Sequence, residues 1–269
     1  MNIIPVERVN IIPEYDIERI NLFIYSNEIR KTILNNLKSY TKLKMFVCSS
    51  CKLMELPDLP ISITHLDCSY NNLTELPDLS SMNLLIYLSF SGNNFKIFPD
   101  LKLLYSFNKL KYLDCSSNSL TELPELPDTL TNFYCSRNNL TKLPIKLPNS
   151  LIILFCSYNN LIKLPNLPYS LEHFDCRNNN LKEMTDLPNS LKGFVCHHNK
   201  LNYTYLNEDI QTINETNSKK RIIKKMQLLD RTLLLEHSAR ISLNPKRIQR
   251  LLDNLEIDFF DGSFDNLTS

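Results

Sequence analysis

The sequence predicts a solenoid of the α/β class, with short parallel strands stacked along one face and helices at the two ends. Three features predict it: a cysteine that recurs every 20 to 25 residues, an asparagine three residues after it, and a leucine-proline pair further on. One repeat cannot bury its apolar residues alone, so stacked repeats must share a core. We count eight repeats within residues 43–204, marked by Cys48, Cys68, Phe90, Cys115, Cys135, Cys156, Cys176 and Cys196.

Each repeat contains a short segment that alternates between apolar and variable residues. In the fourth repeat, Leu110, Leu113 and Cys115 are the apolar members. Alternation with a period of two predicts a strand whose Leu and Cys side chains face the core while the residues between them face outward. The asparagine, Asn118 in this repeat, comes where the chain turns away from the strand. Its amide can bond buried backbone groups, and stacked copies are expected to form a ladder.

The second half of each repeat carries leucine-proline pairs, such as Leu123-Pro124 and Leu143-Pro144. Proline fixes φ, lacks an N–H donor, and disfavours helical geometry in the residue before it. We therefore expect an extended or polyproline-II-like convex side, with no helix in each repeat. The asparagine-serine pairs that precede new strands, such as Asn149-Ser150, are typical of turns.

Residues 1–42 are the expected N-terminal cap, in which residues 26–42 have apolar side chains at helical spacing. An F-box-like adaptor is the alternative for this segment. Residues 205–269 form a C-terminal helical segment. The sequence predicts one amphipathic helix over residues 219–237 and a second that begins at Asn244, which is followed by proline. These two helices either cap the last repeat or form a small unit that binds a second partner.

Composition argues against several classes of protein. The 30 basic and 29 acidic residues give a net charge of +1, which does not favour nucleic-acid binding. No apolar run is long enough to cross a membrane and the first residues lack a secretory signal, so we expect an intracellular, cytoplasmic protein and favour a monomer. Three glycines leave no phosphate-binding loop. We expect no enzyme activity, catalytic residue or cofactor.

The recurring cysteines suggest metal, redox or disulfide chemistry, but their position favours core packing. The position faces inward, and Phe90 substitutes for cysteine in one repeat. Side chains stacked in a parallel ladder do not point at one another as a disulfide requires. Cys196 and its neighbours His197 and His198 face opposite sides of the strand, so we expect no shared metal ion.

The repeat pattern L-x-x-L-x-C-S-x-N-x-L-x-x-L-P resembles the leucine-rich repeat over residues 43–204. Its short, proline-marked form is similar to the LPX-type repeats of bacterial effector proteins. The cysteine position and the richness in Asn and Lys resemble leucine-rich-repeat proteins of giant DNA viruses of amoebae, for which the compartment would be the host cytoplasm. The resemblance implies a curved solenoid whose concave sheet binds a protein partner, and it implies no catalytic residues.

The outward strand positions are the candidate partner-binding site. Aromatic and apolar residues gather in the middle repeats, and charged residues beside them would orient a partner. The sequence therefore favours a non-enzymatic scaffold for protein-protein interaction. The alternatives are a ubiquitin-pathway adaptor that recruits a ligase through its terminal helices and a structural protein of a virus particle. The candidate residues are His65, Asp67, Tyr87, Tyr112, Asp114, Tyr134, Arg137, Ile153, Phe155, His173, Asp175 and Arg177.

Overall fold

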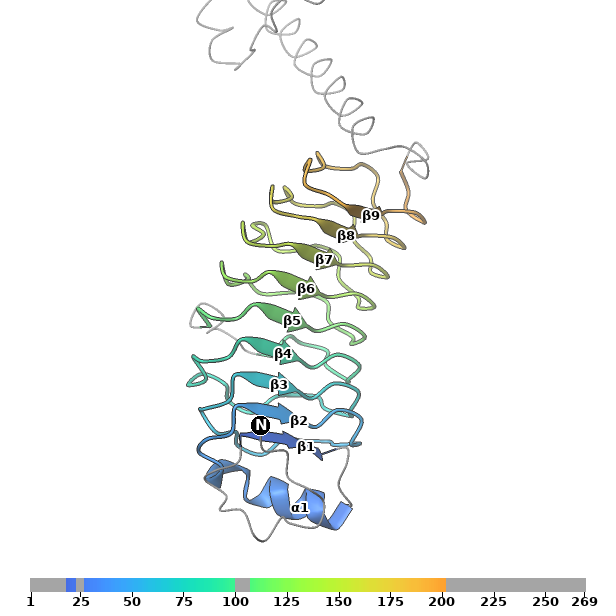
Figure 1. Cartoon of the computed structure of the whole chain (residues 1–269). Helices are drawn as coiled ribbons and strands as arrows, with labels where there is room; N and C mark the ends of the chain where they lie inside the picture. The colour runs from blue at the N-terminus through green and yellow to red at the C-terminus, as the bar shows by residue number, and fades with distance from the viewer. Residues whose placement is uncertain (1–17, 23–26, 100–106, 202–269) are drawn as a thin grey trace, which may run out of the picture. The chain divides into compact units, whose positions relative to one another are not determined.

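The computed structural model describes residues 18–22, 27–99 and 107–201. Within them the chain forms one sheet of nine parallel strands, whose order in the sheet follows the order in the sequence (Figure 1). The helix α1 (Asn27–Asn35) and the 3-10 helix η3 (Leu37–Ser39) lie between the first two strands in the sequence. The strands are β1 (Arg19–Asn21), β2 (Met45–Val47), β3 (His65–Asp67), β4 (Tyr87–Ser89), β5 (Tyr112–Asp114), β6 (Asn132–Tyr134), β7 (Ile153–Phe155), β8 (His173–Asp175) and β9 (Gly193–Val195).

The strand register aligns identical positions of neighbouring repeats. Phe46 of β2 pairs with Leu66 of β3, and Leu113 of β5 pairs with Phe133 of β6. Each repeat therefore adds one strand to the sheet, and equivalent residues of successive repeats lie side by side. The predicted parallel-strand solenoid is confirmed.

The apolar columns predicted from the sequence form one continuous core. The central residue of each strand from β2 (Phe46) to β7 (Leu154) is fully buried, as are six of the seven recurring cysteines. Cys196, in the last described repeat, is 5% exposed. Phe90 occupies the cysteine position of its repeat and packs against Phe95, with ring centroids 4.9 Å apart. The inward orientation expected for these columns is confirmed.

The asparagine of each repeat bonds two repeats together. Asn138 Nδ2 donates to the carbonyl oxygens of Cys135 in its own repeat and Cys115 in the repeat before, at 3.2 and 3.0 Å. Its Oδ1 accepts the backbone N–H of Leu120 at 3.0 Å. These bonds confirm the predicted ladder, because they satisfy buried backbone groups that the sharp turn leaves unpaired. The same donor and acceptor pattern recurs at Asn71, Asn93, Asn118, Asn159, Asn179 and Asn199.

A second ladder, which the sequence indicated only as a turn, precedes the strands. The hydroxyl of Ser170 donates to the carbonyl oxygen of Leu151, one repeat back, at 2.7 Å. The N–H of Leu171 then donates to the carbonyl oxygen of Pro168. The turn is thus tied both to itself and to the preceding repeat. Equivalent hydroxyl bonds are made by Ser62, Thr129, Ser150 and Ser190.

The residue two positions after each recurring cysteine adopts a positive φ. Gly92 has φ of 64°, yet the other repeats place larger residues in the same conformation, including Tyr158 at 55° and Arg137 at 56°. Left-handed geometry is unfavourable for side chains with a Cβ atom. The neighbouring asparagine ladder offsets this cost, and the turn projects the side chain at this position away from the core.

The sheet begins earlier than the sequence predicted. Strand β1 lies in the segment assigned to the N-terminal cap, and its Ile20 pairs with Phe46. Ile33 of α1 and Leu37 of η3 are fully buried, so this segment adds to the core, and the capping role of α1 stays a prediction. The described residues between β2 and β9 contain no helix, since the prolines remove donors.

Two other expectations concern the ends of the chain and the membrane. The C-terminal helical segment expected over residues 205–269 lies outside the described residues. In the part of the chain that the structure describes, no helix combines the length and apolar character needed to span a bilayer.

Candidate interaction face

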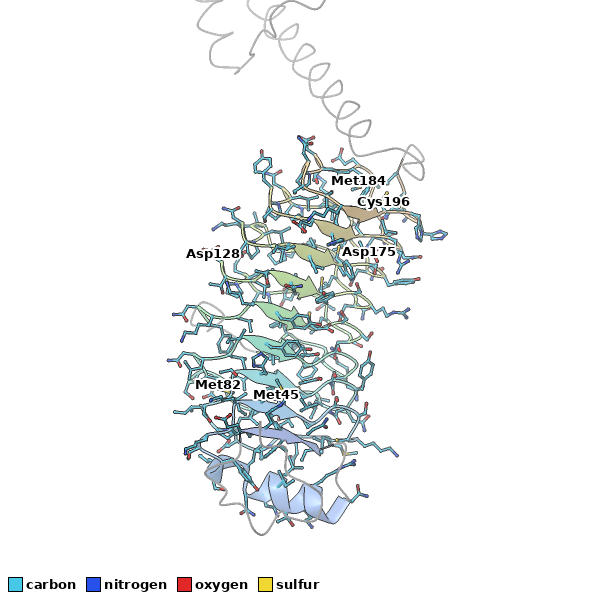
Figure 2. All side chains as sticks on the ribbon, in the orientation of Figure 1. Met45, Met82, Asp128, Asp175, Met184 and Cys196 are labelled. Carbon is cyan, nitrogen blue, oxygen red and sulfur yellow. The ribbon has the colours of Figure 1, made fainter. Side chains whose placement is uncertain are left out.

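The outward side chains of β2 to β9, with the two residues that follow each recurring cysteine, form what we call the open face. In β5, Leu113 is buried while Tyr112 and Asp114 on either side of it are partly exposed. Strands β2, β3, β6 and β7 repeat this alternation with a buried central residue, whereas in β4 the third residue, Ser89, is buried as well. Figure 2 shows the labelled Asp175 at strand β8, whereas Asp128 lies in the loops to one side of the strands. The twelve residues predicted from the sequence all belong to the open face.

Five ring side chains touch in sequence across β3 to β7, and we call them the aromatic row: His65, Tyr87, Tyr112, Tyr134 and Phe155. Tyr87 and Tyr112 stack with ring centroids 4.2 Å apart and planes 12° apart. Tyr112 continues to Tyr134 at 5.1 Å, and Tyr134 meets Phe155 edge to face at 5.3 Å. All five rings are partly exposed. Contacts of this geometry stabilise the row itself and present a large apolar area with few rotatable bonds.

The aromatic row changes strand position between β5 and β6. His65, Tyr87 and Tyr112 lie three residues before the recurring cysteine position, whereas Tyr134 and Phe155 lie one residue before it. Asn132 of β6 and Ile153 of β7 fill the first position instead. The row therefore crosses the open face diagonally, and Ile153 widens its apolar area at β7.

Two carboxylates flank the tyrosine pair. Asp67 Oδ1 accepts the N–H and the hydroxyl of Ser69, at 3.1 and 2.6 Å. Asp114 Oδ1 accepts the N–H of Ser116 at 2.9 Å, yet burial raises the pKa of this carboxyl above its ordinary value. Burial, and then the charge of Asp67, raises the pKa of Tyr87. Burial followed by Asp114 raises the pKa of Tyr112 in the same way.

A second charged group lies toward the C-terminal strands. The guanidinium of Arg137 is 4.7 Å from the centre of the Tyr158 ring, and that of Arg177 is 5.9 Å from it. Arg177 Nε also lies 3.2 Å from Asp175 Oδ2. Asp175 is only 7% exposed and its carboxylate lies beside Arg177, so its expected part in orienting a partner stays a prediction. We call Arg137, Tyr158 and Arg177 the Arg-Tyr-Arg group.

The two predicted histidines have different surroundings. His65 begins the aromatic row 6.0 Å from Tyr87, and burial lowers its pKa. The His173 ring lies close over Gly193. A Cβ atom added to that glycine would come within 2.9 Å of His173 Nδ1. His173 is separate from the aromatic row, so the structure brings only His65 of the two histidines into it.

Tyr158 and the hydrogen bonding among the serines of the open face were not predicted. Tyr158 was missed, although it holds the same repeat position as Arg137, and that shared position is the signal that could have identified it. A row of serines follows the recurring cysteine position, and within it the Ser157 hydroxyl donates to the Ser136 hydroxyl at 3.0 Å. These hydroxyls add hydrogen-bonding groups beside the aromatic row.

The cysteines do not contribute to the open face. All eight are free thiols, and burial raises the pKa of the Cys196 thiol to about 11. A thiol that resists ionisation is a poor nucleophile and a poor metal ligand. Among residues 18–22, 27–99 and 107–201, no three His, Cys, Asp or Glu side chains gather where they could hold a metal ion.

A cavity of about 720 Å³ lies between α1 and the chain that follows β2. Arg30, Lys31, Glu55 and Asp58 line it together with Cys51. None of the residues predicted from the sequence lines this cavity, and its mixed charges do not select one class of ligand.

The comparisons with known proteins concern the repeats. A family model for the leucine-rich repeat matches residues 62–84 and 109–130. No curated protein matches the chain. The structure of YopM from Yersinia pestis, titled a leucine-rich effector protein, is 34% identical with a TM-score of 0.55, over 61% of this chain and 45% of that one.

Two further structures are similar to this chain. YopM from Yersinia enterocolitica WA-314 is 32% identical with a TM-score of 0.50, over 61% of this chain and 39% of that one. The LRIM1/APL1C complex is 25% identical with a TM-score of 0.56, over 62% of this chain and 33% of that one. The matched region spans less than half of each of these three structures.

Proposed function

We propose that this chain, which carries a leucine-rich-repeat solenoid, is a non-enzymatic scaffold that binds a protein partner on its open face. The aromatic row is the single observation that carries this proposal. Its five rings contact one another across five consecutive strands and stay partly exposed. Clustered, partly exposed aromatic side chains are characteristic of protein-protein interfaces, where they provide most of the binding free energy.

The groups around the aromatic row also suit a protein partner. Asp67 and Asp114, the neighbouring serines and Arg137 place polar groups at the rim of an apolar centre. Interfaces between proteins commonly have this composition, with an apolar centre and a polar rim. Each strand from β2 to β8 is hydrogen-bonded to a neighbour on both sides, so little conformational entropy of the backbone is lost on binding.

The relatives support this function at the level of the fold. The LRIM1/APL1C structure is by its title a complex, and the Yersinia pestis YopM structure is titled an effector protein. The buried thiols argue against cysteine catalysis, since burial raises the pKa of each recurring cysteine. Free thiols also suit a reducing compartment, so we include the cytoplasm in the proposal. The ubiquitin-adaptor alternative depends on terminal segments that fall largely outside the described residues.

Affinity capture with a matched pair of variants tests this function. Tyr112→Ala with Tyr134→Ala shortens the aromatic row at its centre. Ile145→Ala with Tyr169→Ala removes two apolar side chains that are 89% and 92% exposed away from the strands. We expect the first pair to abolish capture of the partner and the second pair to retain it, with both variants folded by circular dichroism. A partner that still binds the Tyr112→Ala/Tyr134→Ala chain would refute the open face as the binding site.

A further inference from the structure

The Arg-Tyr-Arg group has a fixed arrangement. Tyr158 is 42% exposed, and guanidinium groups from the repeats before and after it lie against its ring. Positive charge over an aromatic face is electrostatically favourable. The positive-φ turns at Arg137 and Tyr158 project both side chains from the strand ends. The group is therefore ordered before any ligand binds.

The two arginines differ in charge balance. Arg177 is held by Asp175, whose carboxylate lies 3.2 Å from the Arg177 Nε atom. In the described part of the chain, Arg137 makes no ion pair, and its side chain is exposed. The Arg-Tyr-Arg group and Asp175 together carry a net charge of +1. One positive charge is thus available to a ligand, together with the guanidinium donors that the Asp175 contact leaves unused.

Charge is unevenly distributed along the open face. Asp67 and Asp114 lie on β3 and β5, and no Lys or Arg occupies the outward positions of β3, β4 or β5. Arg137 and Arg177 follow β6 and β8. An acidic group of a partner would be repelled by the first half and attracted by the second. The aromatic row runs from the first half into the second, so this distribution gives a bound partner one preferred orientation.

We propose that the Arg-Tyr-Arg group is an anchor for a carboxylate side chain of an acidic peptide segment in the protein partner. The inference rests on the proposed function and adds the chemistry and location of one contact. Arginine binds a carboxylate through two parallel N–H donors, and these charge-assisted bonds are among the strongest in interfaces. Phe155 lies three residues before Tyr158 in the same repeat, so an apolar residue of the partner would contact it beside the acidic residue.

The charge balance favours a carboxylate over a phosphate group. A phosphate monoester carries about 1.5 to 2 negative charges at neutral pH. The site offers a net charge of only +1. Asp175 is nearly buried beside Arg177 and would repel the second charge of a phosphate. A single carboxylate matches the site without leaving unbalanced charge.

Binding of a fluorescein-labelled hexaglutamate peptide to the full chain, followed by fluorescence anisotropy, tests the proposal. A hexaglutamine peptide is the uncharged control. Arg137→Gln with Arg177→Gln removes the two cations. Lys142→Gln with Lys163→Gln removes the same charge from exposed positions in the segments that follow β6 and β7.

We expect hexaglutamate, and not hexaglutamine, to bind the unmodified chain and the Lys142→Gln/Lys163→Gln variant. The arginine variant should bind at least about tenfold more weakly. Equal loss in the two variants would show a general charge effect and overturn the proposal. So would the absence of hexaglutamate binding, or displacement of the peptide by lower concentrations of inorganic phosphate than of acetate.

Partner capture separates this inference from the proposed function. A partner that requires Tyr112 and Tyr134 but binds the Arg137→Gln/Arg177→Gln variant normally would leave the scaffold function intact and refute the acidic anchor. A partner that requires none of the four residues would refute the open face itself. Thermal unfolding of each variant establishes that a lost interaction is not a lost fold.

Discussion

The Nε atom of Arg30 in α1 donates a hydrogen bond of 2.7 Å to the carbonyl oxygen of Leu22, directly after β1. In later repeats the asparagine ladder bonds this carbonyl position, as when Asn71 Nδ2 donates to the Cys48 carbonyl. The first repeat has Cys51 at the asparagine position. An arginine from the helix therefore satisfies a backbone group that the repeat itself leaves unbonded.

Arg30→Ala should lower the free energy of unfolding by about 1 to 3 kcal/mol, because the part-buried Leu22 carbonyl loses a charge-assisted bond. Lys31→Ala, an exposed neighbour on the same helix, should change it by less than about 0.5 kcal/mol. Urea denaturation measures both.

Cys51→Asn restores the ladder residue and offers an independent check on this bond. In the Cys51→Asn chain, Arg30→Ala should cost less than in the unmodified chain, because the new amide can donate to the Leu22 carbonyl. A double-mutant cycle measures this coupling. If Arg30→Ala costs the same in both backgrounds, Arg30 and residue 51 do not share that carbonyl.

Asn138→Ala should be strongly destabilising. The substitution removes the bonds from Asn138 to Cys115, Cys135 and Leu120 and leaves buried backbone groups unpaired. We expect a loss of about 2 to 4 kcal/mol. The adjacent Asn139 is exposed, and among the described residues its side chain makes only a 3.5 Å bond to the Ser119 carbonyl, so Asn139→Ala is the matched control. Similar unfolding midpoints for the two variants would contradict this account of the ladder.

The repeat core could be predicted because each of its constraints is local and recurs. Cys135, Asn138 and Leu140 lie at fixed spacings that are visible in one repeat and are repeated in the others. Strand alternation then assigns each position to the core or to the surface. The outward positions of the aromatic row follow from the same rule, which is why the candidate residues lie on one face.

The remaining features depend on interactions that break the repeat. Strand β1 lacks the cysteine and the asparagine, and only the alternation of Ile20 and Leu22 indicates it. Arg30 acts across a segment of different sequence, so no spacing predicts its bond. The partnership of Arg137 and Arg177 with Tyr158 depends on side-chain direction at a positive-φ turn, which the sequence pattern does not specify.

The thiols should differ sharply in reactivity. Cys51 is part-exposed, and burial raises its pKa, although the nearby Arg30 charge opposes that rise. The recurring cysteines lie in the core. At pH 8 an aromatic disulfide reagent should therefore label Cys51 first, with the others protected until the chain unfolds. Cys51→Ser should abolish the fast phase, and unfolded protein should yield eight thiols. Rapid labelling in the folded Cys51→Ser variant would contradict the buried column.

Alkaline pH should destabilise the fold. Burial raises the folded-state pKa of thiols such as Cys115 and Cys176, so the unfolded chain loses these protons first as the pH rises above about 8.5. The stabilising contribution of each neutral buried thiol is present below that pH and is lost above it. The fall in stability for each buried thiol should be about 0.7 kcal/mol per pH unit at that pKa and should approach about 1.4 kcal/mol per pH unit at higher pH. Urea denaturation between pH 8.5 and 9.5, roughly the window set by that pKa, measures the slope.

Cys135→Ala supplies the control for the pH dependence. Removing one buried thiol should make the slope of stability against pH less steep by about 1 kcal/mol per pH unit over this window, whatever the variant does to stability at neutral pH. An unchanged slope would assign the alkaline effect to groups other than the cysteine column.

Phe90→Cys restores the residue found at this position in the seven other repeats, yet it should destabilise the protein. Phe90 is fully buried, and its ring lies 4.9 Å from Phe95 and 5.6 Å from Phe98 between centroids. A cysteine would leave a cavity among these rings, with an expected loss of about 2 to 4 kcal/mol. The reverse change, Cys135→Phe, should cost about 1 to 3 kcal/mol by overpacking. Urea denaturation measures the stability of both variants. A Phe90→Cys chain more stable than the unmodified protein would show that the residue common to the other repeats, and not the local packing, sets the preference at this position.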